Sequence, residues 1–316
     1  MAGVSDRVAL GVGLPQVFVG AAVDTDMIQR YAVRAETLGF TSLWVQEGYL
    51  TPAAYLDPLE LLSFVSPLTS ATRLGVSVIV PARHEPVVLA KRLATLDHLS
   101  GGRLTIGLAV GPARESFGRA SEPDIRSRDR FLECVDLLGA LWTAEPVTHD
   151  GPLWRVEGGS MSPRPLQKPR PPVWIGGGSP PALRRAALVA DGWMGAGSST
   201  VADFAEQAAS LRKALEDAGR ERAGFTVSKR VYIGVDRDTA RAARRWREYR
   251  TGIYGSHGPP IEVAVVGSPE TCLETLEQLV EAGADHLALT PVFDDEEQLE
   301  ALAELTQLRA ALAPRP

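Results

Sequence analysis

The segment PVWIGGGSPPALRR, residues 172–185, joins a short apolar run to a helical pattern through three consecutive glycines. The apolar run of residues 173–176 has the length of a buried strand. Ser179 and Pro180 are typical of a helix start, because serine caps a helix and proline is tolerated in its first turn. The segment is therefore predicted to be a strand–turn–helix unit, the repeating element of α/β folds.

Seven other segments have the apolar pattern of a strand, and segments with helical periodicity lie between most of them. The predicted strands are residues 8–14, 42–48, 73–80, 104–110, 192–196, 225–235 and 286–292. The predicted helices begin near residue 25 and at residue 86, include residues 131–142, and lie at residues 201–218, 239–249, 269–282 and 298–312. Eight strands with interleaved helices predict an α/β fold, a single (β/α)8 TIM barrel over residues 1–316. A doubly wound sheet is the alternative, although it would rarely need eight strands.

Proline and glycine interrupt this pattern between the fourth and fifth strands. Seven prolines and three glycines lie within residues 146–172. This composition predicts an irregular insertion segment, about residues 144–172, rather than a helix.

Composition excludes several classes of protein. The net charge of −6 over 316 residues argues against nucleic acid as the main partner. Apolar runs of about 18 residues are absent, so no membrane-spanning helix is predicted. The two cysteines, Cys134 and Cys272, lie in amphipathic segments and predict buried free thiols in a reducing cytoplasm. The histidines lack metal-ligand spacing, so no metal site is predicted.

The glycine run has the chemistry of an anion site. In a TIM barrel, ligands bind where strands end and helices begin. The N–H groups of Gly177, Gly178 and Ser179 and the serine hydroxyl can donate to an anion there. Arg184 and Arg185 add positive charge one turn later. A bound phosphate fits these features, and the alternative is a turn that only reverses the chain.

Four stretches together resemble the luciferase-like oxidoreductase superfamily, (β/α)8 enzymes that use reduced FMN or the deazaflavin coenzyme F420. They are AETLGFTSLWVQEGY (35–49), TRLGVSVIVPARHEPVVLAKRLATLDHLSGGRLTIGLAVG (72–111), PRPLQKPRPPVWIGGGSPPALRRAALVADGW (163–193) and GSPETCLETLEQLVEAGADHLAL (267–289). In this order they span nearly the whole chain.

The resemblance implies a cofactor site. The residues implied for the cofactor phosphate are Gly176, Gly177, Gly178 and Ser179. A non-proline cis peptide bond between Ser77 and Val78 is implied to bulge against the ring, and an ordinary trans strand is the alternative. Val110 and Gly111 are implied to offer backbone contacts to the ring.

The acid–base residues follow the family only in part. Glu47 matches an acidic residue near the cofactor, but Gly48 stands where relatives have a histidine and Pro112 where some have a glutamate. These departures argue against a sugar-phosphate dehydrogenase mechanism. His84 can act as an acid or base near neutral pH, or it is a solvent-facing loop residue.

The resemblance implies an F420-dependent oxidoreductase that transfers a hydride to or from a small organic substrate. An FMN-dependent monooxygenase is the alternative, and a non-catalytic binding protein is the second. A separate reductase would supply reduced cofactor, and a homodimer is the expected assembly.

Overall fold

The computed structural model describes residue 4 and residues 8–111, 127–255 and 258–307. Its centre is a closed barrel of eight parallel strands, in which each strand pairs with the next in chain order and the last pairs with the first. The strands are β1 (Ala9–Gly13), β3 (Ser42–Val45), β5 (Arg73–Ile79), β6 (Leu104–Leu108), β9 (Val173–Gly176), β10 (Gly192–Gly195), β11 (Thr226–Val235) and β13 (His286–Pro291). All eight predicted strands and the TIM-barrel class are confirmed.

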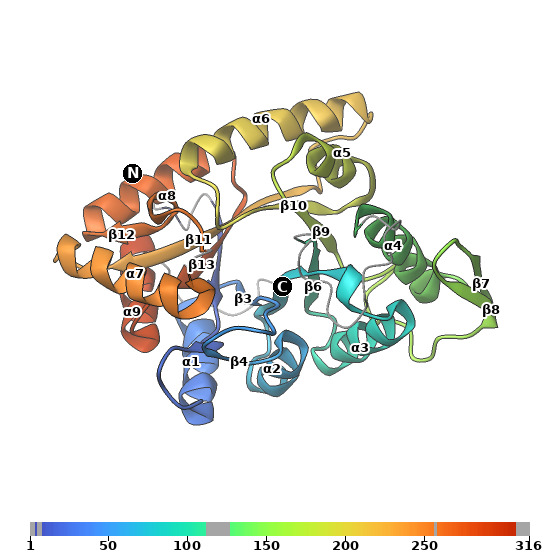
Figure 1. Ribbon diagram of the computed structural model, residues 1–316, viewed down its shortest axis with the longest axis horizontal. Coiled ribbons are helices and arrows are strands. Elements are labelled where there is room, and N and C mark those ends of the chain that lie inside the picture. The colour runs from blue at the N-terminus through green and yellow to red at the C-terminus, as the bar shows by residue number, and fades with distance from the viewer. Residues whose placement is uncertain (1–3, 5–7, 112–126, 256–257, 308–316) are drawn as a thin grey trace, which may run out of the picture.

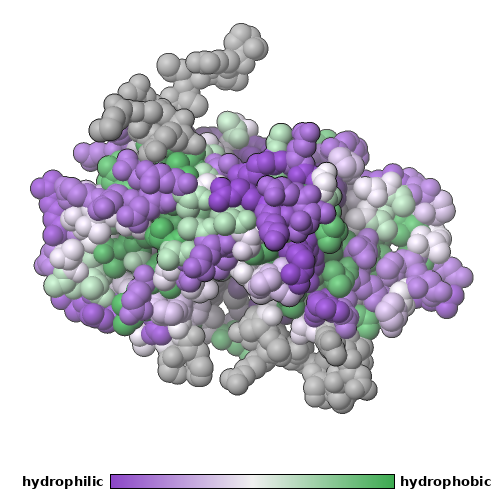
Figure 2. All heavy atoms as spheres, turned by 90° about the horizontal axis from the view of Figure 1, so that it is seen from above, coloured by the Kyte–Doolittle hydropathy of each residue, from purple (hydrophilic) through white to green (hydrophobic). Residues whose placement is uncertain are grey.

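Helices surround the strands (Figure 1). They are α1 (Thr25–Leu38), α2 (Pro58–Val65), α3 (Pro86–Leu99), α4 (Ser127–Thr143), α5 (Pro180–Val189), α6 (Val201–Asp217), α7 (Thr239–Tyr254), α8 (Pro269–Glu281) and α9 (Asp295–Thr306). The predicted helices are confirmed, except that residues 308–312 lie outside the described residues. Helix α2 was not predicted. Hydrophilic side chains cover much of the outer surface, as Figure 2 shows for one face.

The insertion segment is not irregular throughout. It contains an antiparallel hairpin of β7 (Val147–Asp150) and β8 (Arg155–Gly159), which Figure 1 shows beside α4. The buried carboxylate of Glu133 on α4 accepts hydrogen bonds from the N–H groups of Leu153 and Trp154. A side chain on a helix thus orders the hairpin turn, a contact that segment composition does not indicate. Three short strands were also not predicted: β2 (Val17–Phe18), β4 (Ala54–Tyr55) and β12 (Val265–Gly267).

A small group of polar side chains lies inside the barrel, near the amino-terminal ends of β3 and β13. His286 lies between two serines, with 2.8 Å from its Nε2 to Oγ of Ser42 and 2.8 Å from its Nδ1 to Oγ of Ser228. The indole N–H of Trp44 donates to the Ser42 hydroxyl at 2.8 Å, and Trp44 stacks on Trp174 with ring centroids 5.2 Å apart. Burial lowers the pKa of His286 to about 3, so the ring is neutral at physiological pH.

Two glycines make room for this layer. A Cβ at Gly11 would lie 2.5 Å from Nε1 of Trp44, and one at Gly75 would lie 2.4 Å from its Cζ3. Because such approaches are shorter than van der Waals contact, neighbouring strands must carry glycine for the indole to occupy the barrel axis.

His286 should make folding stability depend on pH. Between pH 6.5 and about 3 the unfolded chain binds a proton that the folded chain does not, so stability should fall as pH falls through this window. The slope from this group should approach about 1.4 kcal/mol per pH unit. Urea unfolding at pH 7 and pH 5 should show a smaller stability difference for His286→Asn than for the wild type. His98→Gln, which removes an exposed histidine, is the control and should retain the wild-type difference.

Candidate active site

The predicted cis peptide bond between Ser77 and Val78 is confirmed. It lies near the carboxyl end of β5, where the pairing with β6 shifts register between Val76 and Ile79. The two residues of the bond face different neighbours. Ser77 lines a cavity at the barrel mouth, whereas Cγ1 of Val78 would lie 3.0 Å from a Cβ at Gly176. The bulge therefore lies between the cavity and the glycine turn.

The glycine turn connects β9 to α5 as predicted, and Gly177 has a φ of +114°. Ser179 is the N-cap of α5, but its side chain makes no capping hydrogen bond. Pro180 and Pro181 have no N–H, and the N–H of Ala182 donates to the backbone carbonyl of Ser179 at 2.8 Å. Within the described part of the chain, the N–H groups of Gly178 and Ser179 donate to no protein acceptor. Two N–H groups and a hydroxyl are thus available at a helix N-terminus, which fits a phosphate.

Gln207 on α6 extends this group of polar atoms. A Cβ at Gly178 would lie 2.3 Å from the side-chain amide nitrogen of Gln207. The side-chain oxygen of Gln207 is buried and has no hydrogen-bond partner among the described residues. An unpaired amide oxygen beside a turn with no side chain is consistent with a ligand group that donates a hydrogen bond at this position. Sequence reasoning missed Gln207, because nothing in α6 indicates which of its residues meets a turn 29 positions earlier.

Val110 and Gly111 follow β6, beside the end of β5. Gly111 has a φ of +75°, and a Cβ there would lie 2.5 Å from Cγ1 of Val80. Val110 is half-buried. Their proposed contacts with a ring stay predictions, and Pro112 lies outside the described residues.

Glu47 and His84 are brought together, but not at the cavity. The side chain of Glu47 is 1% exposed and accepts three hydrogen bonds: from the N–H of Val80 at 3.0 Å, Nη1 of Arg83 at 2.8 Å and Nε2 of His84 at 3.0 Å. This carboxylate connects the end of β3 to the segment that follows β5. The hydroxyl of Tyr49 is 3.5 Å from the same nitrogen of His84. Glu47 therefore orients its neighbours and has little surface left for a ligand.

The space beside Gly48, where relatives have a histidine side chain, is filled by another residue. A Cβ at Gly48 would lie 2.9 Å from the ring of Tyr55, on β4. The tyrosine ring thus occupies the space into which a side chain at residue 48 would extend.

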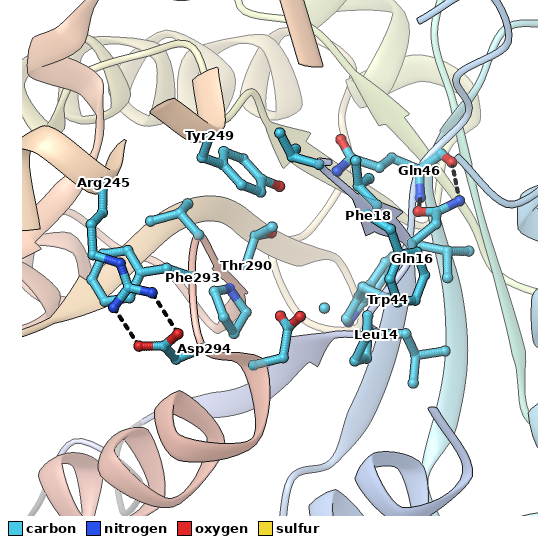
Figure 3. Close-up of a pocket in the computed structure, with 18 of the residues that line it drawn as sticks. Leu14, Gln16, Phe18, Trp44, Gln46, Arg245, Tyr249, Thr290, Phe293 and Asp294 are labelled. Atoms are coloured by element: carbon cyan, nitrogen blue, oxygen red, sulfur yellow. Dashed lines mark hydrogen bonds and ion pairs between the residues drawn. The ribbon is translucent and has the colours of Figure 1, made fainter. Parts of the chain in front are cut away.

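A cavity of about 470 Å³ opens at the carboxyl ends of β1, β3 and β13, beside the middle of β11. Figure 3 shows the aromatic rings of Phe18, Trp44, Tyr249 and Phe293 around it. Ser77 is the predicted site residue in its lining, which includes neither Glu47, His84 nor the glycine turn.

Two polar groups in the cavity lining are held by other protein groups. The side chain of Gln16 donates to the carbonyl of Gln46 at 2.7 Å and accepts from its N–H at 2.9 Å, and Arg245 pairs with Asp294 at the rim (Figure 3). Arg230, on β11, also lines the cavity, and sequence reasoning missed it. The segment SKRVY (228–232) places Lys229 and Arg230 on opposite faces of the strand, and its sequence alone does not show which of the two faces the barrel interior.

Comparisons with known proteins agree with this fold. A family model of luciferase-like monooxygenases matches residues 12–286. An F420-dependent glucose-6-phosphate dehydrogenase of Kineococcus radiotolerans is 27% identical over 318 residues, which covers 90% of this chain and 91% of that protein.

Two solved structures share the fold. A coenzyme F420-dependent tetrahydromethanopterin reductase from Methanopyrus kandleri superposes with a TM-score of 0.77, at 18% identity over 96% of this chain and 100% of that one. The oxygenating constituent of 3,6-diketocamphane monooxygenase from Pseudomonas putida, in complex with FMN, has a TM-score of 0.73 at 18% identity over 98% of this chain and 100% of that one.

The chain belongs to the luciferase-like monooxygenase family, since the family model covers most of its length. The predicted family is confirmed, and so is the prediction that the protein is an oxidoreductase. In the described residues, no helix is both long enough and apolar enough to cross a membrane.

Removing the charge of Glu47 should destabilise the barrel mouth. Glu47→Gln would remove the negative charge that Nη1 of Arg83 contacts at 2.8 Å, in a pair whose side chains are 7% and 1% exposed. Breaking a buried pair in this way costs about 3–5 kcal/mol. Urea unfolding should show a loss of that size, whereas Glu300→Gln, in an exposed pair with Arg34, should change stability little. Wild-type stability in Glu47→Gln would contradict a structural role for the carboxylate.

Proposed function

We propose that this chain is an F420-dependent oxidoreductase that transfers a hydride to or from a small organic substrate at the carboxyl ends of the barrel strands. The observation that carries the proposal is the position of the Ser77–Val78 bulge, with the glycine turn on one side and the cavity on the other. The F420-dependent relative of Kineococcus radiotolerans, which matches over nearly the whole chain, supports this cofactor.

Different residues of this chain would bind different parts of the cofactor. The free N–H groups of Gly178 and Ser179 would donate to its phosphate, with the amide of Gln207 beside them. The bulge at Ser77 and Val78 would support one face of the ring. When bound, F420 supplies a carbon centre that donates or accepts a hydride. The 470 Å³ cavity, on the Ser77 side, would hold the substrate.

We propose His84, which lies at the barrel mouth but outside the cavity lining, as a residue that holds or moves a proton. Its Nε2 faces the Glu47 carboxylate, which would keep the ring in one orientation, and its side chain is 14% exposed. Glu47 acts here as a positioning residue, because its oxygens are occupied by three donors. A carboxylate that orients an imidazole in this way is common where histidine transfers protons.

An FMN-dependent monooxygenase is the alternative function. The solved FMN complex with a similar fold supports it, since both cofactors carry a ring and a phosphate and the glycine turn cannot distinguish them. The match to an F420-dependent dehydrogenase over 90% of this chain favours hydride transfer. The tyrosine ring against Gly48 favours a substrate other than a sugar phosphate, because it occupies the space of the family's histidine.

Three further features belong to this proposal. A separate enzyme would supply reduced cofactor, which a coupled assay with and without a cofactor-reducing enzyme tests. A homodimer is proposed by resemblance, and light scattering tests it. A reducing, cytoplasmic location is consistent with Cys134 and Cys272, which are buried free thiols.

His84→Gln should slow turnover if His84 transfers a proton. General acid–base catalysis contributes about 10²–10⁴-fold, so kcat should fall by about 10²-fold or more. Cofactor affinity should stay within about twofold, because the substitution leaves the glycine turn unchanged. His98→Gln is the control. Wild-type kcat and an unchanged pH profile in His84→Gln would remove this residue from the reaction.

Titrations should show which of the two cofactors, F420 or FMN, the protein binds more tightly. Fluorescence titrations of the purified protein with oxidised and reduced F420 and FMN should give tighter binding of F420. Gly178→Asp should weaken F420 binding at least about tenfold, or 1.4 kcal/mol, because a carboxylate would face the phosphate. Gly178→Asn, which adds nearly the same volume without charge, should lose less.

The contrary outcomes are distinct. Tighter binding of FMN, with oxygen uptake when reduced FMN and substrate are added, would replace F420 by the alternative. Equal F420 affinity in the Asp and Asn variants would place the phosphate away from residue 178.

A further inference from the structure

Arg230 places an incompletely bonded positive charge in the cavity. Its side chain extends from β11 into the barrel mouth and lines the cavity. Nη2 donates to the hydroxyl of Tyr232, and Nη1 is 3.4 Å from the carbonyl oxygen of Ser77. Nε is buried and has no hydrogen-bond partner among the described residues. At most two of the five N–H donors of the guanidinium are therefore used within the protein.

Neighbouring groups do not neutralise this charge. In the described part of the chain, no carboxylate lies within ion-pair distance of Arg230. Tyr232 contacts both Arg230 and the hydroxyl of Tyr254, and burial raises the pKa of Tyr232 well above its usual range, so it is a neutral phenol. Asp295 also lines the cavity but forms no ion pair with Arg230, and burial raises its pKa to about 7.

Two other arginines near the cavity each form an ion pair with a carboxylate. At the rim of the same cavity, Arg245 is bound by Asp294. Arg83, in the neighbouring cluster, is bound by Glu47. Arg230 differs from both, because its guanidinium has no counter-charge among the described residues and is held by hydrogen bonds and by the ring of Tyr232, whose centroid lies 4.6 Å from Cζ. Its remaining N–H donors are available to an anion in the cavity.

The rest of the cavity lining suits an apolar body. Phe18, Trp44 and Tyr249 present ring surface, and Leu14 and Val292 add aliphatic surface. A ligand that satisfies both features has a compact apolar part and one oxyanion. Guanidinium groups recognise carboxylate and sulfonate oxygens through paired N–H donors.

We propose that Arg230 binds the acidic group of the substrate, and that the substrate is an organic carboxylate or sulfonate with an apolar body. This inference rests on the proposed function, because it names the substrate class of the same site. Since Nη1 of Arg230 approaches the carbonyl of Ser77 on the bulge, an anion held by this arginine lies next to the proposed position of the ring. Arg230 thereby sets which part of the substrate faces the cofactor.

The test is calorimetric titration of the cofactor-free protein with benzoate, benzenesulfonate and the uncharged benzamide. At least one anion should bind at least tenfold more tightly than benzamide. Arg230→Met should lose that preference, and Arg230→Lys should retain part of it because the charge remains. Arg244→Met is the matched control, since Arg244 is an exposed arginine on α7 that does not line the cavity, and it should stay within twofold of the wild type.

The outcomes separate this inference from the proposed function. Anion binding that depends on Arg230, in a protein that binds neither F420 nor FMN, would support the anion site and contradict the proposed function. Equal binding of both anions by the wild type and Arg230→Met would overturn the inference even if F420 binds. Loss of F420 affinity in Arg230→Met with unchanged anion binding would assign Arg230 to the cofactor and overturn it as well.

Discussion

The buried carboxylate of Glu47 is the interaction on which the barrel mouth depends. It lies at the end of β3, and its three donors belong to the segment after β5, more than 30 residues later. One donor is the N–H of Val80, two residues beyond the cis bond, so the carboxylate and the bulge belong to one arrangement. A buried carboxylate requires several donors, and these donors would otherwise be loop atoms without a fixed place. The same contacts that occupy Glu47 also orient His84.

A second constraint operates inside the barrel. Trp44 can lie across the axis because Gly11 and Gly75 carry no side chain there. Its N–H then reaches the serine and histidine layer below. The indole closes the inner end of the cavity, because Trp44 both lines the cavity and contacts the polar layer below it. Packing at the bottom of the barrel and the depth of the candidate substrate site are therefore coupled through one residue.

Charged residues at the barrel mouth fall into two groups. Glu47 and Arg83 bind each other and hold the scaffold, and the pair of Arg245 and Asp294 does the same at the rim. Arg230 keeps unused donors, as do Gly178 and Ser179 at the opposite side of the bulge. Polar groups that the protein leaves unpaired are those available to a ligand. The proposed cofactor phosphate and the proposed substrate anion therefore lie on opposite sides of Ser77 and Val78.

The sequence by itself determined the barrel and the place of the glycine turn, because apolar runs, helical periods and proline and glycine breaks are local properties of the chain. The cis bond at Ser77 and Val78 followed from family resemblance, since no local pattern distinguishes it from a trans strand. The tertiary structure decided the rest. The hairpin at residues 147–159 depends on hydrogen bonds to Glu133 of α4. Its two strands are short and lie in a proline-rich segment, so local sequence does not reveal them. The roles of Glu47 and Arg230 depend on whether neighbours from distant strands satisfy their charges, and this is a property of three-dimensional proximity that no residue pattern along the chain encodes.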